Sequence, residues 1–239
     1  AILKNFNLAY GFDFEIKKNI KPGSGIGSSA ASATGAVYGI NKLIGTPFKR
    51  KELIKFALEG EKYASKAEHA DNIAPALLGG FSLVRSNKTV DVIKLPNPEK
   101  LYATILHQEI ELKTSHARSI LKKSIPLNDV VRQSGNLAAL ISALYTNNYD
   151  LISKSLKDYI IEPYRSKLIP EFDLLKKTAL NYGALGSGIA GSGPSIFALS
   201  KGREIAENVG KEMKKIVSKL PIKHKVYISK INQKGVKVI

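Results

Sequence analysis

The chain lacks cysteine and tryptophan altogether and has one methionine among its 239 residues. A chain without cysteine has no disulfide framework, no thiolate metal site and no cysteine nucleophile. This composition fits a reducing compartment, and no cationic and apolar leader opens the chain, so we expect a cytoplasmic protein. No apolar run approaches the ~20 residues that a membrane-spanning helix needs, and we therefore expect no membrane partner.

Acidic residues are also few, since 20 Asp and Glu stand against 37 Lys and Arg, for a formal net charge of +17. The excess is concentrated at the C-terminal end, where residues 201–239 hold 11 basic and 3 acidic residues. Such a charge suits phosphates, nucleic acid or an anionic surface. Because few aromatic residues accompany the lysines, a solvated basic face is favoured, and no nucleic-acid partner is expected.

The length fits one large domain or two small ones, and 44% hydrophobic with 24% charged residues is typical of a globular protein. The best boundary is Pro96-Asn97-Pro98, because two prolines in three residues stiffen a connection and end regular structure. We therefore predict domains over residues 1–97 and 98–239.

The hydrophobic pattern predicts a mixture of helices and strands. Alternation of Phe12, Phe14 and Ile16 with polar residues predicts a strand over 12–16. Further strands are expected at about 81–85, 90–95, 102–106, 184–189, 195–199 and 225–229. Helices are expected at about 29–44, 50–66, 71–78, 115–122, 127–145, 150–159, 170–181 and 204–220. Strands and helices do not alternate regularly, which favours the α+β class over a doubly wound parallel sheet.

The most informative segment is a loop with three alternating glycines before a predicted helix: Pro22-Gly23-Ser24-Gly25-Ile26-Gly27-Ser28-Ser29-Ala30-Ala31. Glycine allows positive φ and a close approach of backbone to a ligand. The unpaired N–H groups and the dipole of a helix start bind phosphate, and a serine hydroxyl there can bind Mg²⁺. The segment predicts a phosphate-binding loop, although a glycine-rich turn with a serine cap would have the same residues.

The loop fits neither of two common nucleotide-binding motifs. It contains no Gly-Lys-Ser/Thr, which excludes a Walker A loop. Its glycines superficially fit Gly-x-Gly-x-x-Gly, but no acidic ribose-binding residue follows at the required distance, which argues against a dinucleotide fold.

This segment resembles the Pro-x-x-x-Gly-Leu/Ile-Gly-Ser-Ser-Ala-Ala motif of the GHMP small-molecule kinases. A second glycine-rich segment, Gly-Ile-Ala-Gly-Ser-Gly-Pro-Ser at residues 188–195, resembles the third motif of that family. Residues 68–81, 113–118 and 162–170 resemble the homoserine kinase branch in particular. The resemblance extends over essentially the whole chain in the family's order.

The resemblance implies an ATP-dependent kinase that uses Mg²⁺ and phosphorylates the side-chain hydroxyl of L-homoserine, its small-molecule substrate, in threonine biosynthesis. It also implies a two-domain α+β fold with the active site in the cleft between the domains. The N-terminal, ATP-binding domain would be like the second domain of ribosomal protein S5, and the C-terminal domain would be ferredoxin-like. Family members are commonly dimers, so a homodimer is expected.

The chain departs from the family at its N-terminal end. Homoserine kinases carry a longer segment before the first strand expected here, and that segment includes the first family motif. Here the sequence begins Ala1-Ile2-Leu3-Lys4 without that motif. We therefore expect an incomplete N-terminal domain that lacks its first strands.

The resemblance assigns the ATP phosphates to the first loop, formed by Pro22, Gly23, Ser24, Gly25, Ile26, Gly27, Ser28 and Ser29. It assigns Mg²⁺ to Ser29, in preference to Ser28, and to Glu61. Glu61 lies eight residues before His69, which is the spacing of the family's acidic ligand. From its neighbours alone, Glu61 is more simply a charge on a solvated helix face.

The resemblance also assigns the amino-acid substrate to His69, Asn72, Arg118, Arg165 and Gly191. Asn72 and Arg118 would take part in catalysis, together with Thr114 near the reacting hydroxyl. Arginine suits such a role because its planar guanidinium pairs a carboxylate or a phosphate through two hydrogen bonds. Taken alone, the histidine is more simply structural, and surface ion pairs explain the two arginines equally well.

Asn72 bears on the mechanism, because mevalonate kinases carry at this position an aspartate that is proposed as a general base. Asparagine accepts no proton, so transfer would depend on positioning and charge rather than on a strong side-chain base. Asp71 is the fallback base, and a helix cap explains it equally well. Gly191 and Gly193 would support the first loop. His107, His116 and His224 match no motif and are expected to be structural or exposed.

Three alternatives remain, of which a non-catalytic GHMP relative that senses a ligand is disfavoured by the presence of Ser29, Glu61, Arg118 and Arg165. Another GHMP kinase would keep the fold and phosphorylate a mevalonate-type alcohol, and His69, Asn72 and Arg165 argue against it. A basic nucleic-acid-binding protein with an S5-like fold would explain the net charge and would leave the glycine loop unexplained.

Overall fold

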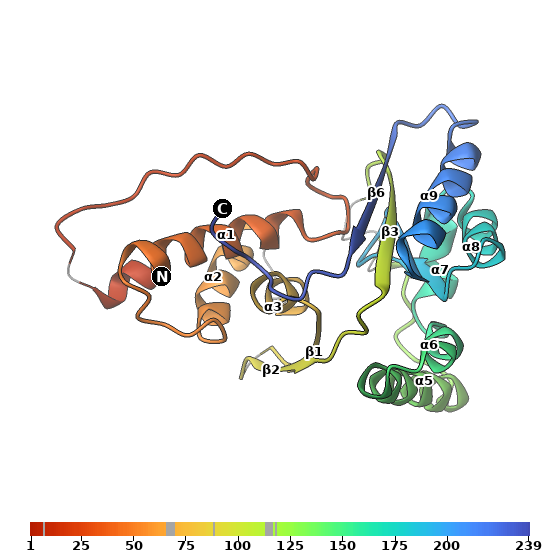
Figure 1. The fold of residues 1–239 in the computed structure, drawn as a ribbon, viewed down its shortest axis with the longest axis horizontal. Helices are drawn as coiled ribbons and strands as arrows, with labels where there is room; N and C mark the ends of the chain where they lie inside the picture. The colour runs from red at the N-terminus through yellow and green to blue at the C-terminus, as the bar shows by residue number, and fades with distance from the viewer. Residues whose placement is uncertain (7, 66–69, 88, 113–116, 118) are drawn as a thin grey trace. The chain divides into compact units, whose positions relative to one another are not determined.

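The computed structural model describes residues 1–6, 8–65, 70–87, 89–112, 117 and 119–239 (Figure 1). The chain forms two compact units. The first comprises Ala1–Pro22, Gly27–Pro96 and Asn232–Ile239, and the second comprises Gly23–Ile26 and Asn97–Ile231. The chain therefore enters the second unit briefly at the glycine loop and returns to the first unit at its C-terminal end.

Three helices form the body of the first unit: α1 (Ser28–Leu43), α2 (Leu53–Ser65) and α3 (Ala70–Leu78). Small residues allow α1 and α2 to pack closely, since a Cβ at Gly60 would lie 3.2 Å from the Cβ of Ala33. The centre of the core is made of fully buried aliphatic side chains: Leu53, Ile54, Ile73 and Leu77. Burial of each such side chain contributes about 1.5–3 kcal/mol. A short 3-10 helix, η1 (Ile2–Asn5), adds Ile2 to the same core.

A two-stranded antiparallel sheet follows α3, with Phe81 opposite Leu95. Its strands are β1 (Phe81–Ser86) and β2 (Asp91–Leu95). The C-terminal segment 232–239 pairs with the end of α3 through backbone hydrogen bonds. The amide of Gly80 donates to the carbonyl of Asn232 at 2.7 Å, and the amide of Val236 donates to the carbonyl of Ala76 at 2.8 Å.

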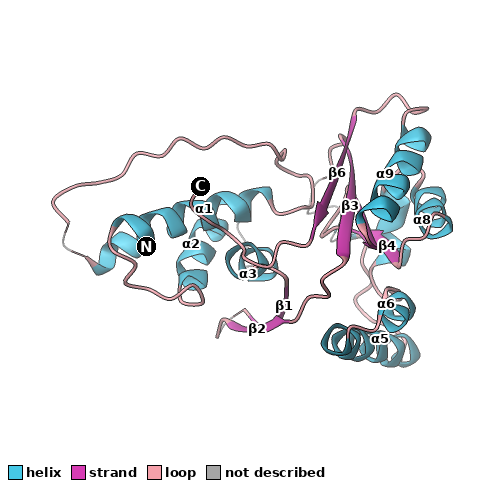
Figure 2. Cartoon of the chain, in the orientation of Figure 1, coloured by secondary structure: helices cyan, strands magenta, loops and turns pink. Residues whose placement is uncertain are grey.

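The second unit contains a four-stranded antiparallel sheet, three of whose strands are labelled in Figure 2. The strand order is β4-β5-β3-β6. The strands are β3 (Leu101–Gln108), β4 (Gly186–Ile189), β5 (Ile196–Lys201) and β6 (His224–Lys230). Helices α8 (Phe172–Asn181) and α9 (Arg203–Val217) cover one face of this sheet. The buried core between the layers includes Leu106, Leu175, Ile196 and Met213.

The connection between β3 and α8 contains α5 (Leu127–Thr146), α6 (Tyr149–Ser155), α7 (Glu162–Arg165) and the 3-10 helix η2 (Ser166–Leu168). Asn148 caps α6, because its side chain accepts a hydrogen bond from the amide of Leu151 at 3.0 Å. None of the helices in the described ranges has both the length and the apolar composition needed to cross a membrane.

The structure confirms the α+β class, but two expected elements differ. The strand predicted over residues 12–16 is wrong: these residues pair with no described strand, and Phe14 and Ile16 are exposed. Alternation in sequence does not supply the neighbouring strand that the backbone groups need. The helix predicted over 150–159 ends at Ser155. Asp158 accepts hydrogen bonds from the next amides along the chain, and such a local turn competes with a helix.

Of the helix predicted over residues 115–122, residues 115, 116 and 118 lie outside the described part of the chain, 117 and 119 are helical, and 120–122 are not helical. Helix α7 is not among the expected helices; it is only one turn long and carries proline at its second position. Proline is favoured in the first turn of a helix, so this short helix is consistent with its sequence.

Candidate active site

The first glycine loop has the backbone conformation that its sequence predicts. Gly23, Gly25 and Gly27 have φ angles of 75°, 76° and 77°. Helix α1 begins directly afterwards, and its N-cap residue Gly27 supplies no side-chain hydrogen bond. The first N–H groups of a helix have no intrahelical acceptor, so the loop ends at donors that can meet phosphate oxygens.

The two glycine-rich segments are in backbone contact within the second unit. A Cβ on Gly25 would lie 2.5 Å from the carbonyl oxygens of Ala190 and Gly193. A Cβ on Gly191 would lie 2.7 Å from the carbonyl oxygen of Gly25. Side chains do not fit at such distances, and both glycines also have positive φ. Glycine at these positions is therefore required by the contact between the two segments.

Ser29 and Glu61 form a hydrogen-bonded pair between the first turn of α1 and α2. The hydroxyl of Ser29 donates to Oε1 of Glu61 at 2.9 Å. Glu61 is only 8% exposed, so its interpretation as a charge on a solvated helix face is wrong. Ser28 differs, since its hydroxyl donates to the carbonyl of Ile20 at 2.9 Å.

These oxygen donors fit a magnesium ion. Mg²⁺ commonly takes one or two carboxylates and completes its octahedron with water and substrate phosphates. Among the residues described, no cluster of three or more His, Cys, Asp or Glu side chains is found that could hold a metal by itself. The Ser29–Glu61 pair at the end of the glycine loop suits a metal that is held jointly with a nucleotide.

Asn72 lies in the first turn of α3, with its side chain against the end of the loop. A Cβ on Gly27 would lie 3.2 Å from Oδ1 of Asn72. Asp71 accepts a hydrogen bond from the amide of Asn72 at 3.1 Å and lies within the first turn of α3, where a carboxylate suits the helix dipole but is not the N-cap. The structure thus brings Asn72 to the glycine loop. His69, Thr114 and Arg118, also predicted for the site, lie outside the described residues.

Arg165 ends α7 and connects three sequence-distant parts of the second unit. Its Nε donates to the carbonyl of Ala117 and one terminal nitrogen donates to the carbonyl of Gly191, both at 3.1 Å. Arg165 thus contacts the second glycine-rich segment and the residue that precedes Arg118. Both carbonyls fix the orientation of a guanidinium that remains partly accessible.

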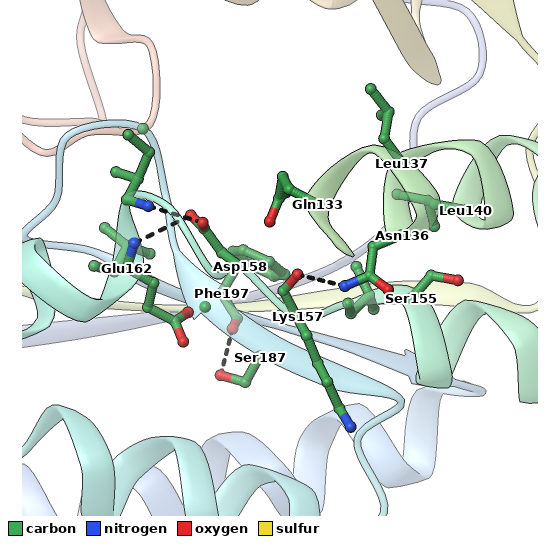
Figure 3. Close-up of a pocket in the computed structure, with 15 residues that line it drawn as sticks. Gln133, Asn136, Leu137, Leu140, Ser155, Lys157, Asp158, Glu162, Ser187 and Phe197 are labelled. Carbon is green, nitrogen blue, oxygen red and sulfur yellow. Dashed lines mark hydrogen bonds between the residues drawn. The ribbon is translucent and has the colours of Figure 1, made fainter. Parts of the chain in front are cut away.

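A cavity of about 250 Å³ in the second unit was not predicted from sequence (Figure 3). Its lining includes Gln133, Asn136, Asp158, Glu162, Gly188 and Gly191. Burial raises the pKa of the Glu162 carboxyl, and its ion pair with Lys176 offsets part of that rise. The ion pair and burial explain Glu162 as a structural group of this wall.

Ser195 ends the second glycine-rich motif and is not among the predicted site residues. Its hydroxyl donates to the carbonyl of Ser24 in the first loop at 2.6 Å. The only sequence signal was its place directly after Gly193 and Pro194. His107, expected to be structural or exposed, is buried and contacts Ser195.

Comparison with known proteins identifies the family. Residues 1–80 match the GHMP kinases N terminal domain, and residues 140–219 match GHMP kinases C terminal. A homoserine kinase of Chlorobium phaeobacteroides is 48% identical over 229 residues, which are 95% of this chain and 72% of that protein. A crystal structure of homoserine kinase from Cytophaga hutchinsonii has a TM-score of 0.90 and 52% identity, covering 93% of this chain and 70% of the other.

The fold extends to more distant kinases. The structure of L. major mevalonate kinase in complex with R-mevalonate has a TM-score of 0.64 over 88% of this chain and 67% of the other, at 17% identity. That likeness shows the fold alone. The predicted GHMP kinase fold is confirmed by the two domain matches. Because both GHMP kinase domains match and homoserine kinases are 48% and 52% identical to this chain over most of their length, the chain belongs to the homoserine kinase family of the GHMP kinases.

Proposed function

We propose that the protein transfers the γ-phosphoryl group of ATP to the side-chain hydroxyl of L-homoserine, which yields ADP and O-phospho-L-homoserine. Within the family that the comparisons establish, the observation that carries this proposal is the glycine loop that ends beside the Ser29–Glu61 pair. A phosphate cradle next to a buried carboxylate is the arrangement that phosphoryl transfer requires. The reaction is a step of threonine biosynthesis.

The first loop binds the nucleotide in this proposal. Its three glycines have positive φ, a conformation that lets loop N–H groups meet phosphate oxygens, and the start of α1 adds its dipole. Ser29 and Glu61 would hold the metal through oxygen, as Mg²⁺ prefers. A magnesium ion held there would neutralise part of the negative charge of the phosphates.

Transfer proceeds in line and without a strong side-chain base. The homoserine oxygen bonds to the γ-phosphorus as the bond from that phosphorus to the bridging oxygen breaks, and the hydroxyl proton is released to solvent. Asn72 hydrogen-bonds and orients, since an amide takes up no proton. Arg165 supplies positive charge for the amino-acid carboxylate or the transferred phosphate. The rate therefore depends on positioning and charge.

The proposal also covers the oligomeric state and the cellular compartment of the enzyme. We expect a homodimer in the cytoplasm, on the basis of the family resemblance and of a composition without cysteine. Light scattering coupled to size-exclusion chromatography measures the mass directly. A mass near 26.0 kDa per particle for this chain would contradict the dimer.

The test is ADP release by the purified protein at its natural full length with Mg-ATP. Homoserine, mevalonate, galactose and no acceptor are compared side by side. We expect release with homoserine alone. Activity with mevalonate instead would favour the alternative kinase, and ATP-independent, salt-dependent binding of nucleic acid without any kinase activity would favour the other alternative. The comparisons do not favour either alternative.

A pair of glutamates on α2 links the activity to the site. Glu61→Gln keeps an acceptor for Ser29 but removes the charge, so we expect kcat to fall about a hundredfold or more and the Mg²⁺ requirement to rise. Glu59→Gln removes an exposed charge from the same helix and should leave both unchanged. Equal effects of the two substitutions would show that Glu61 holds no metal.

A further inference from the structure

Ser195 and His107 form a buried chain of hydrogen bonds that ends on the first glycine loop. The hydroxyl oxygen of Ser195 lies 2.6 Å from the carbonyl oxygen of Ser24, and Nδ1 of His107 lies 3.1 Å from the same hydroxyl oxygen. Each of the three residues is at most 4% exposed. All three belong to the second unit, although Ser24 is flanked in sequence by segments of the first.

The acceptor at the end of this chain fixes the proton positions. A carbonyl oxygen only accepts, so Ser195 gives its single hydroxyl hydrogen to Ser24. Ser195 then has no hydrogen left for the imidazole, and Nδ1 of His107 must be the donor in the other bond. The imidazole therefore orients the hydroxyl, and the hydroxyl holds the carbonyl of the loop.

The strand register explains how these two residues meet. Strands β3 and β5 pair antiparallel, and their last registered pair is Leu106 with Ile196. His107 and Ser195 are the next residues outward on each side, so they lie opposite one another. The contact follows from strand pairing and from the turn of residues 190–195, in which the amide of Ala190 donates to the carbonyl of Ser195 at 2.8 Å.

The bond to Ser24 has a consequence for the neighbouring amide. In a planar trans peptide the C=O and N–H groups point in opposite directions. When Ser195 holds the carbonyl of Ser24, the N–H of Gly25 points away from Ser195. Glycine tolerates both signs of φ, so this peptide could otherwise rotate and present its carbonyl oxygen where an N–H is needed.

We propose that His107 and Ser195 are positioning residues that hold the Ser24–Gly25 peptide with its N–H available to the phosphates of ATP. The inference rests on the proposed function, because it concerns the nucleotide loop of that reaction. It predicts an effect on the use of ATP that is separate from the use of homoserine.

The test compares four variants of the full-length protein with the wild type: Ser195→Ala, His107→Ala, His107→Asn and Ser200→Ala. Ser200→Ala is the matched control, since Ser200 is fully buried on β5 and its hydroxyl has no hydrogen-bond partner within the described ranges. The readouts are KM for ATP, KM for homoserine, kcat, the melting temperature and the dissociation constant of ATP by calorimetry.

We expect Ser195→Ala to raise KM and Kd for ATP about tenfold, as the loss of one buried hydrogen bond does, with KM for homoserine within about twofold. His107→Ala should have a smaller effect in the same direction. His107→Asn should restore ATP binding, because its side-chain amide donates from nearly the position of Nδ1. Ser200→Ala should match the wild type.

An unchanged KM and Kd for ATP in Ser195→Ala would overturn the inference. Equal losses of ATP affinity in Ser195→Ala and Ser200→Ala would also overturn it. So would a rise in KM for both ATP and homoserine that accompanies a lower melting temperature. Failure of the proposed function is distinguishable: a wild type that binds ATP but releases no ADP with homoserine contradicts that function. The ATP dissociation constants of the same variants then decide the inference.

Discussion

Glu61 shows how burial changes the meaning of a charged residue. A carboxylate on a helix of mixed charge is ordinarily a solvated group, but this one is almost inaccessible and hydrogen-bonded to Ser29. An isolated buried carboxylate is costly, so a buried carboxylate is normally paired or bound to a metal. Asn72 makes the complementary point, because its contact with Gly27 places an amide, rather than a base, at the end of the loop.

Glu162 predicts a pH dependence of stability at the residue scale. Burial raises its pKa in the folded protein above the usual value of about 4.3, so the folded chain binds this proton more tightly than the unfolded chain does. Stability from this group is therefore gained as pH falls from above the raised pKa to below the usual one. Glutamine does not titrate, so Glu162→Gln lacks this contribution. The stability of the wild type relative to the variant should therefore increase as the pH is lowered.

Urea unfolding of both proteins between about pH 7 and pH 4 measures this difference in the free energy of unfolding. The matched control is Glu99→Gln, which removes one exposed carboxylate from the same unit. If the difference in the free energy of unfolding between the wild type and Glu162→Gln is the same at every pH measured, the raised pKa of Glu162 is contradicted.

At the scale of elements, α3 depends on a segment from the far end of the chain. The helix ends at Leu78, just before Gly79 and Gly80, and residues 232–239 pack against that end. Lys94 on β2 adds hydrogen bonds from its ammonium group to the carbonyls of Leu78 and Gln233, at 2.7 Å and 3.1 Å. The helix that carries Asn72 in its first turn is thus anchored at its last turn by the C-terminal segment.

Gly79→Ala tests this packing. A Cβ there would lie 2.4 Å from the amide nitrogen of Gly235 and 2.5 Å from the carbonyl oxygen of Gln233, at a φ of +73°. We expect the free energy of unfolding to fall by about 3 kcal/mol, from unfavourable φ and from overpacking together. Gly45→Ala is the control, since its φ is +87° with nothing within 4 Å, and it should cost about 1–2 kcal/mol. If denaturant titration gives the same loss in the free energy of unfolding for Gly79→Ala and Gly45→Ala, the C-terminal segment moves away from the added methyl group without cost.

At the scale of the whole molecule, the formal net charge of +17 attracts polyanions. ATP is a polyanion, whereas homoserine is a zwitterion without net charge. We therefore expect kcat/KM for ATP to fall several-fold between about 0.02 M and 0.3 M salt, because the Debye length shortens over that range. The kcat/KM for homoserine, measured at saturating ATP, should change little over the same range of salt concentration. Steady-state kinetics at constant Mg²⁺ excess give both values, and parallel salt dependences would argue against steering of ATP by the net charge.

Much of the fold could be predicted because it depends on local sequence. Alternating glycines before a run of small residues predict a loop and a helix start, and both lie where expected, with α1 beginning at Ser28. Hydrophobic spacing likewise located most helices and strands within a few residues. The strand expected over residues 12–16 failed because pairing depends on a neighbour rather than on the segment itself. The predicted domain limits, 1–97 and 98–239, and the roles of the site residues stay predictions.

The α+β class, the two glycine-rich segments and the resemblance to the GHMP kinases can be inferred from the amino-acid sequence, since each of these depends on residue types at short spacing. Three contacts cannot be inferred in that way: Glu61 is buried against Ser29, residues 232–239 return to α3, and Ser195 holds the carbonyl of Ser24. Ser24 and Ser195 are 171 residues apart along the chain. Their contact depends on strand pairing and core packing, which bring distant backbone groups together only after the chain has folded.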